Sequence, residues 1–467
     1  MTTKTVPTQQ ATIPVVLVLT VHPDERDQEK DREAEMHSLL DTAGRSVVAT
    51  LVQHLQKPAP GTYIGSGKVE ELKTSVLDSG AQQVVFDVRL SPRQQRNLEE
   101  EISVPVLDYD ELILDIFARN ARTNQAMLAV ELAQAEYDKA RLKRLWTHLD
   151  RQSVGGSSGS GSGFKAGPGE KQIEMDRRQV RKRIQDLKGR LADIAARKDR
   201  AVKTRSDAFN VALVGYTNTG KSTLMNALTN AEVLAQDRLF ATLDTRTAQL
   251  FLDRHHNVVI SDTVGFIRKL PHTLIASFHA TLAEVREADL LLHIIDSSSQ
   301  QMENQIEAVE GVLKTINAEE VPMVMVFNKV DKAYSKTILL AYRRRYKESV
   351  AISALNGTGL DELKELIRSH IDRRAQKVTV RFTVTNGALD AFVRSRAQIL
   401  EEQYDEDDAI LTLVADERLF QELTTNPQLV VTPVEAVIDK TTVNKTTTNK
   451  LTTAKTTVAK TVKKDVR

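Results

Sequence analysis

A glycine-rich segment with one lysine carries the clearest chemical signal in the chain. It follows an apolar run, Asn210 to Val214, that is typical of a buried strand. Glycines at both ends let backbone N–H groups turn inward around phosphate oxygens, and the helix that follows presents its positive end to them. The predicted phosphate contacts are Gly215, Tyr216, Thr217, Asn218, Thr219, Gly220, Lys221, Ser222 and Thr223. Lys221 reaches the β- and γ-phosphates in this pattern, and the Ser222 hydroxyl binds Mg²⁺.

A second segment predicts which base is bound. Asn328-Lys329-Val330-Asp331 directly follows the strand-like run Val321 to Phe327. An ionised Asp331 accepts hydrogen bonds from the ring N–H and the exocyclic amine of guanine, whereas adenine presents a lone pair at the same place. Sites of this kind discriminate by about 10⁴ to 10⁵. We therefore expect GTP as the substrate, with Asn328, Lys329 and Asp331 in the guanine site.

Two further segments complete the expected pocket. Ser353-Ala354-Leu355 follows the strand Ser349 to Ile352 and is expected to back the base with a main-chain N–H. Asp262-Thr263-Val264-Gly265 follows the strand Asn257 to Ile260. Asp262 is expected to hold the Mg²⁺ shell, and the Gly265 N–H to meet the γ-phosphate, so that this loop senses whether the γ-phosphate is present.

A threonine is expected to close on Mg²⁺ only in the triphosphate state. The candidate with the most suitable spacing before the Asp262 strand is Thr242, in the segment from Phe240 to Leu243, with Thr245 and Thr247 as competitors. We take Lys221, Thr242 and Gly265 as the catalytic set, and Ser222, Thr242 and Asp262 as the metal set.

Phe266 stands where many GTPases have a glutamine that orients the attacking water. A phenyl ring cannot hydrogen-bond to that water, so intrinsic hydrolysis is expected to be slow and to need help from a partner or an ion. Asn218 offers one route, because a side-chain oxygen near the β/γ bridge could support K⁺. This K⁺ role is a hypothesis that equal rates in K⁺ and Na⁺ would exclude.

The elements around this pocket predict an α/β, multi-domain chain. Residues 206–373 are expected to form a P-loop GTPase domain with a doubly wound, mostly parallel sheet. A small α/β domain is expected at 13–118, with strands at Val15 to Val21, Val47 to Val52, Val84 to Phe86 and Val104 to Leu107. In it, the glycine-containing turn at 63–68 opens a helix, and a simple strand-to-helix turn is favoured over an anion site.

Residues 119–205 are expected to form a helical hairpin with a mobile glycine-rich tip at 154–170. Apolar residues recur at helical spacing from about Asn124 to Leu149 and again from Val180 to Ile194, and each seam needs a partner. From Lys139 to Arg205 there are 19 Lys or Arg residues against 7 Asp or Glu. Charged helix faces are commonly only solvated, yet such an imbalance is typical of a surface that contacts a phosphate backbone.

A small C-terminal α/β domain is expected at 374–434, with strands Val378 to Val384 and Ile410 to Val414 around a helix from Ala388 to Glu402. The acidic run Asp405 to Asp408 reads as a solvated turn. Residues 435–467, rich in Lys and Thr, are expected to be a disordered tail.

Composition narrows the class of protein. The chain has 467 residues, a formal net charge of +1 and no cysteine, which excludes disulfides and Cys-based zinc sites. No stretch approaches the roughly 20 apolar residues that cross a bilayer, and the N-terminus lacks the layout of an export signal. We expect a cytoplasmic monomer without an integral membrane span.

Taken together, these segments resemble the HflX family of translation-associated GTPases, and the match covers about residues 13–433. It is carried by YIGSGKVEEL (63–72), LSPRQQRNL (90–98), LILDIFARNAR (112–122), WTHLDRQ (146–152), GPGEKQIEMDRR (167–178), GYTNTGKST, LFATLD and DTVGFIRKLPH. The chain departs from the family at the tip, with an inserted-looking GSSGSGSGFKA and with Lys165, Lys171 and Met175.

The resemblance implies GTP-dependent binding to the large ribosomal subunit, to its RNA and proteins, with the hairpin tip directed toward ribosomal RNA. It also implies a role in splitting stalled or stress-inactivated ribosomes, with hydrolysis stimulated by the ribosome. The alternative is a GTP-gated signalling or scaffold switch whose hairpin binds a protein partner.

Overall fold

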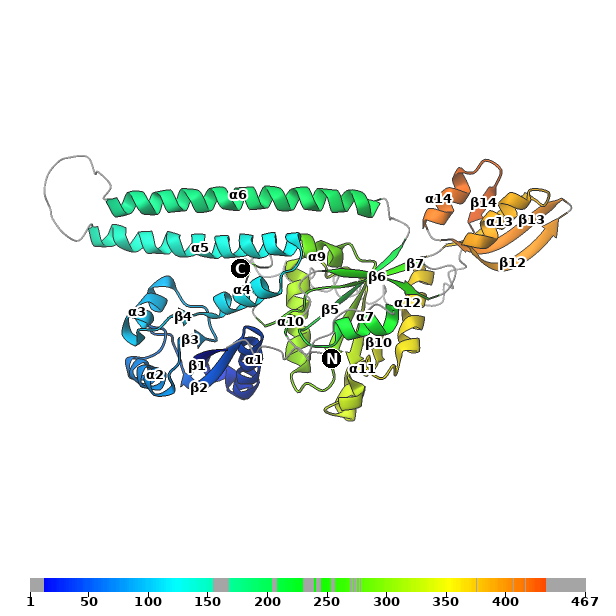
Figure 1. The fold of residues 1–467 in the computed structure, drawn as a ribbon. Helices are drawn as coiled ribbons and strands as arrows, with labels where there is room; N and C mark the ends of the chain where they lie inside the picture. Colours follow the sequence, from blue (N-terminus) through cyan, green and yellow to red (C-terminus); the bar gives the residue numbers. More distant parts are fainter. Residues whose placement is uncertain are drawn as a thin grey trace, which may run out of the picture. The chain divides into compact units, whose positions relative to one another are not determined.

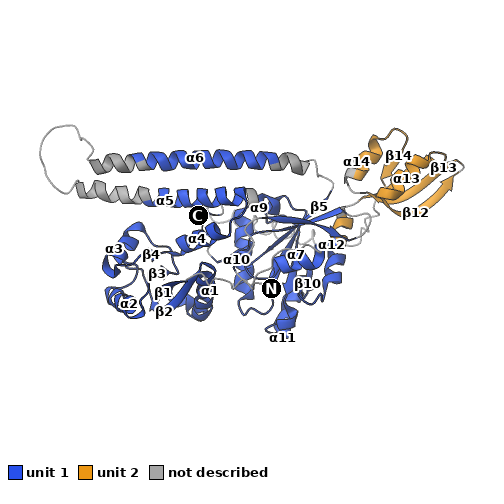
Figure 2. Cartoon of the chain, viewed as in Figure 1, with its two compact units in different colours: residues 1–367 blue, residues 368–467 orange. Residues whose placement is uncertain are grey.

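The computed structural model divides into two compact units, residues 1–367 and residues 368–467 (Figure 2). It describes residues 12–153, 168–203, 208–229, 239–240, 245–252, 257–268, 271, 274, 277, 279–374, 376–405, 407–415 and 417–433. None of the helices in these ranges combines the length and the apolar character that a bilayer span requires.

The N-terminal part of the first unit is a four-stranded parallel sheet in the order β2-β1-β3-β4. Its β-branched strands favour a pleated, buried surface, and Val15 to Leu19 are at most 1% exposed. The glycine-containing turn opens α2, with Gly65 as the residue before the helix, and Lys68 in the first turn of α2 bonds to Glu71 at 2.9 Å. The elements are β1 (Ile13–Val21), η1 (Pro23–Gln28), α1 (Glu29–Thr42), β2 (Arg45–His54), α2 (Ser66–Ser79), β3 (Gln83–Phe86), α3 (Pro92–Ile102), β4 (Val106–Leu107) and α4 (Tyr109–Asn120).

Two long helices, α5 (Asn124–Ser153) and α6 (Pro168–Lys203), form the predicted hairpin and lie side by side (Figure 1). Ile184, Leu187 and Leu191 of α6 are buried in the seam, as the helical spacing of apolar residues predicts. Ion pairs add to it, with Arg183 Nη2 2.8 Å from Glu131 and Lys188 Nζ 2.8 Å from Glu136. Other basic residues of α6 are exposed, namely Arg178, Arg181, Lys182, Arg190 and Arg197.

The expected GTPase domain (the GTPase part) has a six-stranded sheet in the order β10-β9-β8-β5-β7-β6, parallel except for β6, which pairs antiparallel with β7. The order reverses direction at β5, as a doubly wound sheet requires. The elements are β5 (Phe209–Gly215), α7 (Lys221–Thr229), β6 (Arg246–Phe251), β7 (Asn257–Asp262), α9 (His279–Arg286), β8 (Leu290–Asp296), α10 (Met302–Thr315), β9 (Met323–Asn328), η2 (Val330–Lys332), α11 (Lys336–Arg345), β10 (Ser349–Ala351) and α12 (Leu360–Arg374).

One apolar cluster runs through the N-terminal part, the hairpin and the GTPase part. At its centre the Phe117 ring of α4 lies 4.7 Å from the Phe240 ring, centroid to centroid, and Asn120 donates to the Phe240 carbonyl at 3.1 Å. Because apolar packing is continuous across these parts, residues up to 367 behave as one compact unit.

The second unit is built on an antiparallel sheet, β12-β13-β11-β14. The helix expected from Ala388 to Glu402 was predicted too long, because it ends at Arg396. Residues after it pair with β13, with Ile399 opposite Leu413, and this pairing overrides the helical preference of the glutamates. The elements are β11 (Gln376–Thr383), α13 (Gly387–Arg396), β12 (Gln398–Asp405), β13 (Asp408–Ala415), α14 (Glu417–Thr425) and β14 (Val430–Pro433).

Candidate functional site

The candidate site lies at the carboxyl edge of the six-stranded sheet. The glycine-rich loop follows β5, the segment that begins at Asp262 follows β7, and Asn328 and Ser353 come at or just after the ends of β9 and β10. Carboxyl ends of parallel strands meet at one edge, so residues far apart in sequence converge there. The structure brings together the described members of the predicted set.

Side chains of the glycine-rich loop bind its own carbonyl groups. Thr219, which is 1% exposed, donates its hydroxyl to the Tyr216 carbonyl at 3.0 Å. Lys221 Nζ lies 2.8 Å from that carbonyl and 3.2 Å from the Gly215 carbonyl. Main-chain bonds add to this, since the Thr217 N–H donates to the Phe266 carbonyl at 2.8 Å and the Phe266 N–H donates to the Gly215 carbonyl at 3.0 Å.

Asn328 and Lys329 tie this loop to the neighbouring strands. The Asn328 amide donates to the Thr219 carbonyl at 2.8 Å and accepts from the Ala354 N–H at 3.0 Å. A Cβ on Gly220, whose φ is +94°, would collide with that amide, so glycine is required there. Lys329 Nζ donates to the Asn218 carbonyl at 2.8 Å.

Asp296 was missed by the sequence analysis. It ends β8, and its carboxylate lies 2.7 Å from Lys329 Nζ, which holds that lysine against the glycine-rich loop. Strand β8 was not among the predicted strands. A carboxylate placed directly after the apolar run LLLHII was the available signal.

Asp331 is exposed and accepts a hydrogen bond from the Ser353 hydroxyl at 2.6 Å. This bond is the main reason that the pKa of Asp331 lies below its usual value, so the carboxylate is ionised at neutral pH. Ser353 also accepts from the Asn356 N–H at 3.3 Å, whereas the Leu355 side chain is 75% exposed. The structure thus presents a fixed acceptor on an open side of the site.

Ser222 and Asp262 meet near the start of α7. The Ser222 hydroxyl donates to Asp262 at 2.6 Å, and Asp262 is fully buried. Lys221 is 6% exposed; burial lowers its pKa to about 8, and the negative charge of Asp262 acts in the opposite direction. A hydroxyl and a carboxylate side by side, with an ammonium close to them, suit a metal-bound polyphosphate.

The segment after Asp262 divides its side chains between core and site. The Thr263 hydroxyl donates to the Leu213 carbonyl at 2.6 Å, and Val264 is buried in the core, so only their main chain can face a ligand. Gly265 packs tightly against the glycine-rich loop, because a Cβ there would lie 2.8 Å from Thr217 Cγ2 and 3.0 Å from Lys221 Nζ. Glycine is therefore needed for this close approach.

Tyr216 has a role that its sequence position does not indicate. Its hydroxyl accepts from the Arg268 N–H at 2.9 Å and donates to Glu35 of α1. Tyr109 of α4 donates to the Arg268 carbonyl at 3.0 Å. The N-terminal part therefore contacts both the glycine-rich loop and the segment after Gly265.

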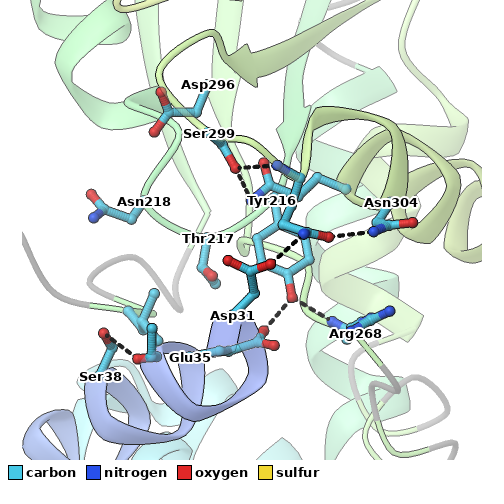
Figure 3. A pocket seen from close by; sticks show the side chains of 14 residues that line it. Asp31, Glu35, Ser38, Tyr216, Thr217, Asn218, Arg268, Asp296, Ser299 and Asn304 are labelled. Atoms are coloured by element: carbon cyan, nitrogen blue, oxygen red, sulfur yellow. Dashed lines mark hydrogen bonds between the residues drawn. The ribbon is translucent and has the colours of Figure 1, made fainter. Parts of the chain in front are cut away.

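A cavity of about 250 Å³ lies beside these contacts (Figure 3). Thr217 and Asn218 line it from the glycine-rich loop, Asp31 and Glu35 from α1, and Asn304 from α10. Polar groups from three elements thus surround a space next to the loop.

Some predicted residues lie outside the described residues. They are Thr242 and Leu243, the tip up to Gly167, and the tail from 435 onward. Of the two competitors to Thr242, Thr245 donates to Glu284 at 3.0 Å, and Thr247 lies in β6 opposite Ser261.

The chain matches three family models in succession. They are described as "GTP-binding GTPase N-terminal" (residues 30–118), "GTP-binding GTPase Middle Region" (120–205) and "50S ribosome-binding GTPase" (210–329). A solved structure of a GTP-binding protein from the archaeon Sulfolobus solfataricus in complex with GDP is 22% identical. Its TM-score is 0.40, and the match covers 76% of this chain and 98% of that one.

Relatives named GTPase HflX match over most of their length. That of Magnetococcus marinus is 42% identical over 80% of this chain and 85% of its own. That of Lacrimispora saccharolytica is 40% identical over 88% of this chain and 96% of its own. That of Escherichia coli K12 is 40% identical over 83% of this chain and 90% of its own. The chain belongs to the HflX family. Like its HflX relatives, it is a GTP-binding protein that hydrolyses GTP.

The pKa of Lys221 predicts how binding of GTP to this HflX protein depends on pH. Phosphate oxygens favour the charged ammonium, so binding raises this pKa from about 8. Affinity for GTP should be full below about pH 8 and fall above it, by about tenfold at most between pH 7 and 9. Calorimetry in buffers of different ionisation enthalpy should also show proton uptake near pH 8.

Lys221→Arg is the matched control, because its guanidinium stays charged throughout this range. His293, a buried titratable group near Lys221, stays neutral, since burial and the Lys221 charge lower its pKa to about 3. If the wild type and Lys221→Arg show the same dependence of GTP affinity on pH, ionisation of Lys221 does not control that affinity.

Proposed function

We propose that this protein is a slow GTPase that binds the large ribosomal subunit in its GTP state and splits or rescues stalled or stress-inactivated ribosomes. The observation that carries the proposal is the basic hairpin: residues 139–205 hold an excess of 12 positive charges. The apolar seam between α5 and α6 is buried, and Arg178, Arg181, Lys182, Arg190 and Arg197 are exposed. Ribosomal RNA offers a phosphate surface that such charges bind.

The family supports the proposal independently. The model that matches residues 210–329 is described as a 50S ribosome-binding GTPase, and the relatives that match over most of their length are named GTPase HflX. The proposal includes a cytoplasmic location, where ribosomes translate. Slow intrinsic hydrolysis follows from Phe266, which is 1% exposed and packed in the core, and the ribosome would supply the stimulation.

In the proposed site, residues 215–223 surround the phosphates, with Lys221 at the β- and γ-phosphates. Asp331 accepts from the guanine ring, and the 353–355 loop backs the base. The Gly265 N–H meets the γ-phosphate. The contacts among Thr219, Asn328 and Ala354 support this arrangement, because they hold the phosphate loop and the base loops in one piece.

Mg²⁺ fits the residues present. Ser222 and Asp262 offer a hydroxyl and a carboxylate oxygen within 2.6 Å of each other, and oxygen donors are the ligands that Mg²⁺ prefers. Thr242 is the third proposed ligand. When bound, the ion supplies positive charge that offsets the charge of the phosphates.

Base recognition is tested by Asp331→Asn. The amide cannot accept two hydrogen bonds from guanine but can donate to the extra carbonyl of xanthine. Affinity for GTP should fall by about a hundredfold or more, and affinity for xanthosine triphosphate should rise. Asp361→Asn, at an exposed aspartate of α12, is the control and should leave both unchanged. Retained preference for GTP in the Asp331 variant would refute the assignment.

Ribosome binding is tested by sedimentation with 50S subunits in a non-hydrolysable GTP analogue. The wild-type protein should co-sediment at moderate salt, and less so with GDP. Arg181→Glu/Lys182→Glu, at exposed positions of α6, should weaken co-sedimentation at least tenfold, since phosphate contacts dominate such binding.

Lys336→Glu/Lys347→Glu makes the same charge change at exposed positions of the GTPase part and serves as the control. Absence of wild-type co-sedimentation would favour the scaffold alternative. Equal loss in both double variants would show that only net charge matters.

Support of hydrolysis by K⁺ is the last part of the proposal. Asn218 has φ +60° and lines the cavity beside the phosphate loop, where its side-chain oxygen can serve a monovalent cation. GTP hydrolysis should be several-fold faster in K⁺ than in Na⁺ at equal ionic strength, and Asn218→Ala should abolish the difference. Equal rates for the wild-type protein would remove K⁺ from the mechanism.

A further inference from the structure

The Thr217 hydroxyl is buried without a hydrogen-bond partner among the described residues. Thr217 is 6% exposed, and no described donor or acceptor lies within reach of its Oγ1. Two other buried threonines of the site are satisfied: Thr219 donates to the Tyr216 carbonyl, and Thr263 donates to the Leu213 carbonyl. A buried polar group left unpaired destabilises a fold, so its retention calls for a functional explanation.

Thr217 lies where the phosphoryl end of GTP is proposed to bind. The glycine-rich loop and the segment after Asp262 meet in a short piece of main-chain pairing, in which the Thr217 N–H donates to the Phe266 carbonyl at 2.8 Å. The Thr217 side chain packs against Gly265: its Cγ2 lies 2.8 Å from the position of a Cβ there, and Lys221 Nζ lies 3.0 Å from the same point. The hydroxyl is carried by the same carbon as that methyl, so it too lies close to Gly265.

The described residues on either side of Gly265 in the facing segment carry no side-chain donor. Val264, Phe266 and Ile267 are at most 5% exposed and belong to the apolar core. The glutamine that many GTPases use at the position of Phe266 is therefore absent, and its space is filled by packing. Among these described neighbours of Gly265, Thr217 carries the unused hydroxyl.

The geometry points to Thr217 as a catalytic residue whose hydroxyl donates a hydrogen bond to an oxygen of the γ-phosphoryl group. The assignment rests on the placement of the phosphates proposed above. In hydrolysis, water forms the new bond to the γ-phosphorus while the bond to the oxygen of the β-phosphate breaks. The water proton leaves with the phosphate, and Thr217 keeps its own proton. A hydrogen-bond donor at this oxygen stabilises the negative charge that the γ-phosphoryl oxygens carry while the bonds to phosphorus form and break.

The test compares Thr217→Val, which keeps the shape and removes the hydroxyl, with Thr217→Ser, which keeps the hydroxyl. Thr217→Val should lower kcat by about tenfold or more, as expected for a hydrogen bond to a charged group, with little change in KM. The dissociation constant for GDP should not change, because GDP lacks the γ-phosphoryl group. Thr217→Ser should restore most of kcat.

A stability measurement separates this role from a structural one. Without nucleotide, the melting temperature of Thr217→Val should equal or exceed that of the wild type, because the removed hydroxyl has no described partner. Thr219→Val is the comparison: its hydroxyl is bonded within the loop, so its loss should lower the melting temperature and weaken GDP and GTP binding alike.

An unchanged kcat in Thr217→Val overturns the assignment, and so does an equal weakening of GDP and GTP binding. Failure of Thr217→Ser to restore kcat also overturns it. The underlying placement of the phosphates is tested separately by Lys221→Ala. If that variant binds GTP as tightly as the wild type, the phosphate site itself is misplaced, whatever the Thr217 variants do.

Discussion

Side chains bind the carbonyl groups of Tyr216, Asn218 and Thr219 in the glycine-rich loop, and the proposed site depends on this constraint. A loop that surrounds an anion must present N–H groups to it, so its carbonyls must be satisfied elsewhere. Lys329 binds the Asn218 carbonyl, Asn328 binds the Thr219 carbonyl, and Thr219 binds the Tyr216 carbonyl. The segment proposed to recognise the base and the loop proposed to bind the phosphates are thereby held together, since Asn328 and Lys329 belong to the proposed guanine segment.

Much of the site could be predicted from sequence because its parts are local. A short loop after an apolar run, such as the one that ends at Asp262, has a defined place at the edge of a parallel sheet, whatever the rest of the chain does. The position of Thr242 stays a prediction, because this residue lies outside the described residues. The hairpin was predictable for a similar reason, because its seam repeats with the helical period.

Other features depend on contacts between distant segments and have no local pattern. The bond of Tyr216 to Glu35 joins residues 181 positions apart, and Asp296 matters only because Lys329 reaches it. The helix expected through Glu402 fails for the same physical reason: glutamates favour a helix locally, but pairing with β13 determines the strand. Tertiary packing overrides local preference wherever the two differ.

Phe266 shows how one residue can serve folding at a cost to chemistry. Its phenyl ring stands where many GTPases have a glutamine that orients the attacking water. In the structure this ring is 1% exposed and lies in the apolar cluster that joins the N-terminal part to the GTPase part. Burying such a ring contributes roughly 2–3 kcal/mol, which a glutamine could not supply there.

The segment that contains Phe266 is also held at Arg268, whose main chain bonds to the hydroxyls of Tyr216 and Tyr109. A shift of the Gly265 segment toward a γ-phosphate would therefore act on contacts with α1 and α4 as well. Because interfaces of this kind have discrete packings, a small displacement at the phosphate can be passed to the N-terminal part without any long-range charge effect. The apolar ring to which the proposed slow hydrolysis is assigned thus also belongs to the core that joins the GTPase part to the N-terminal part.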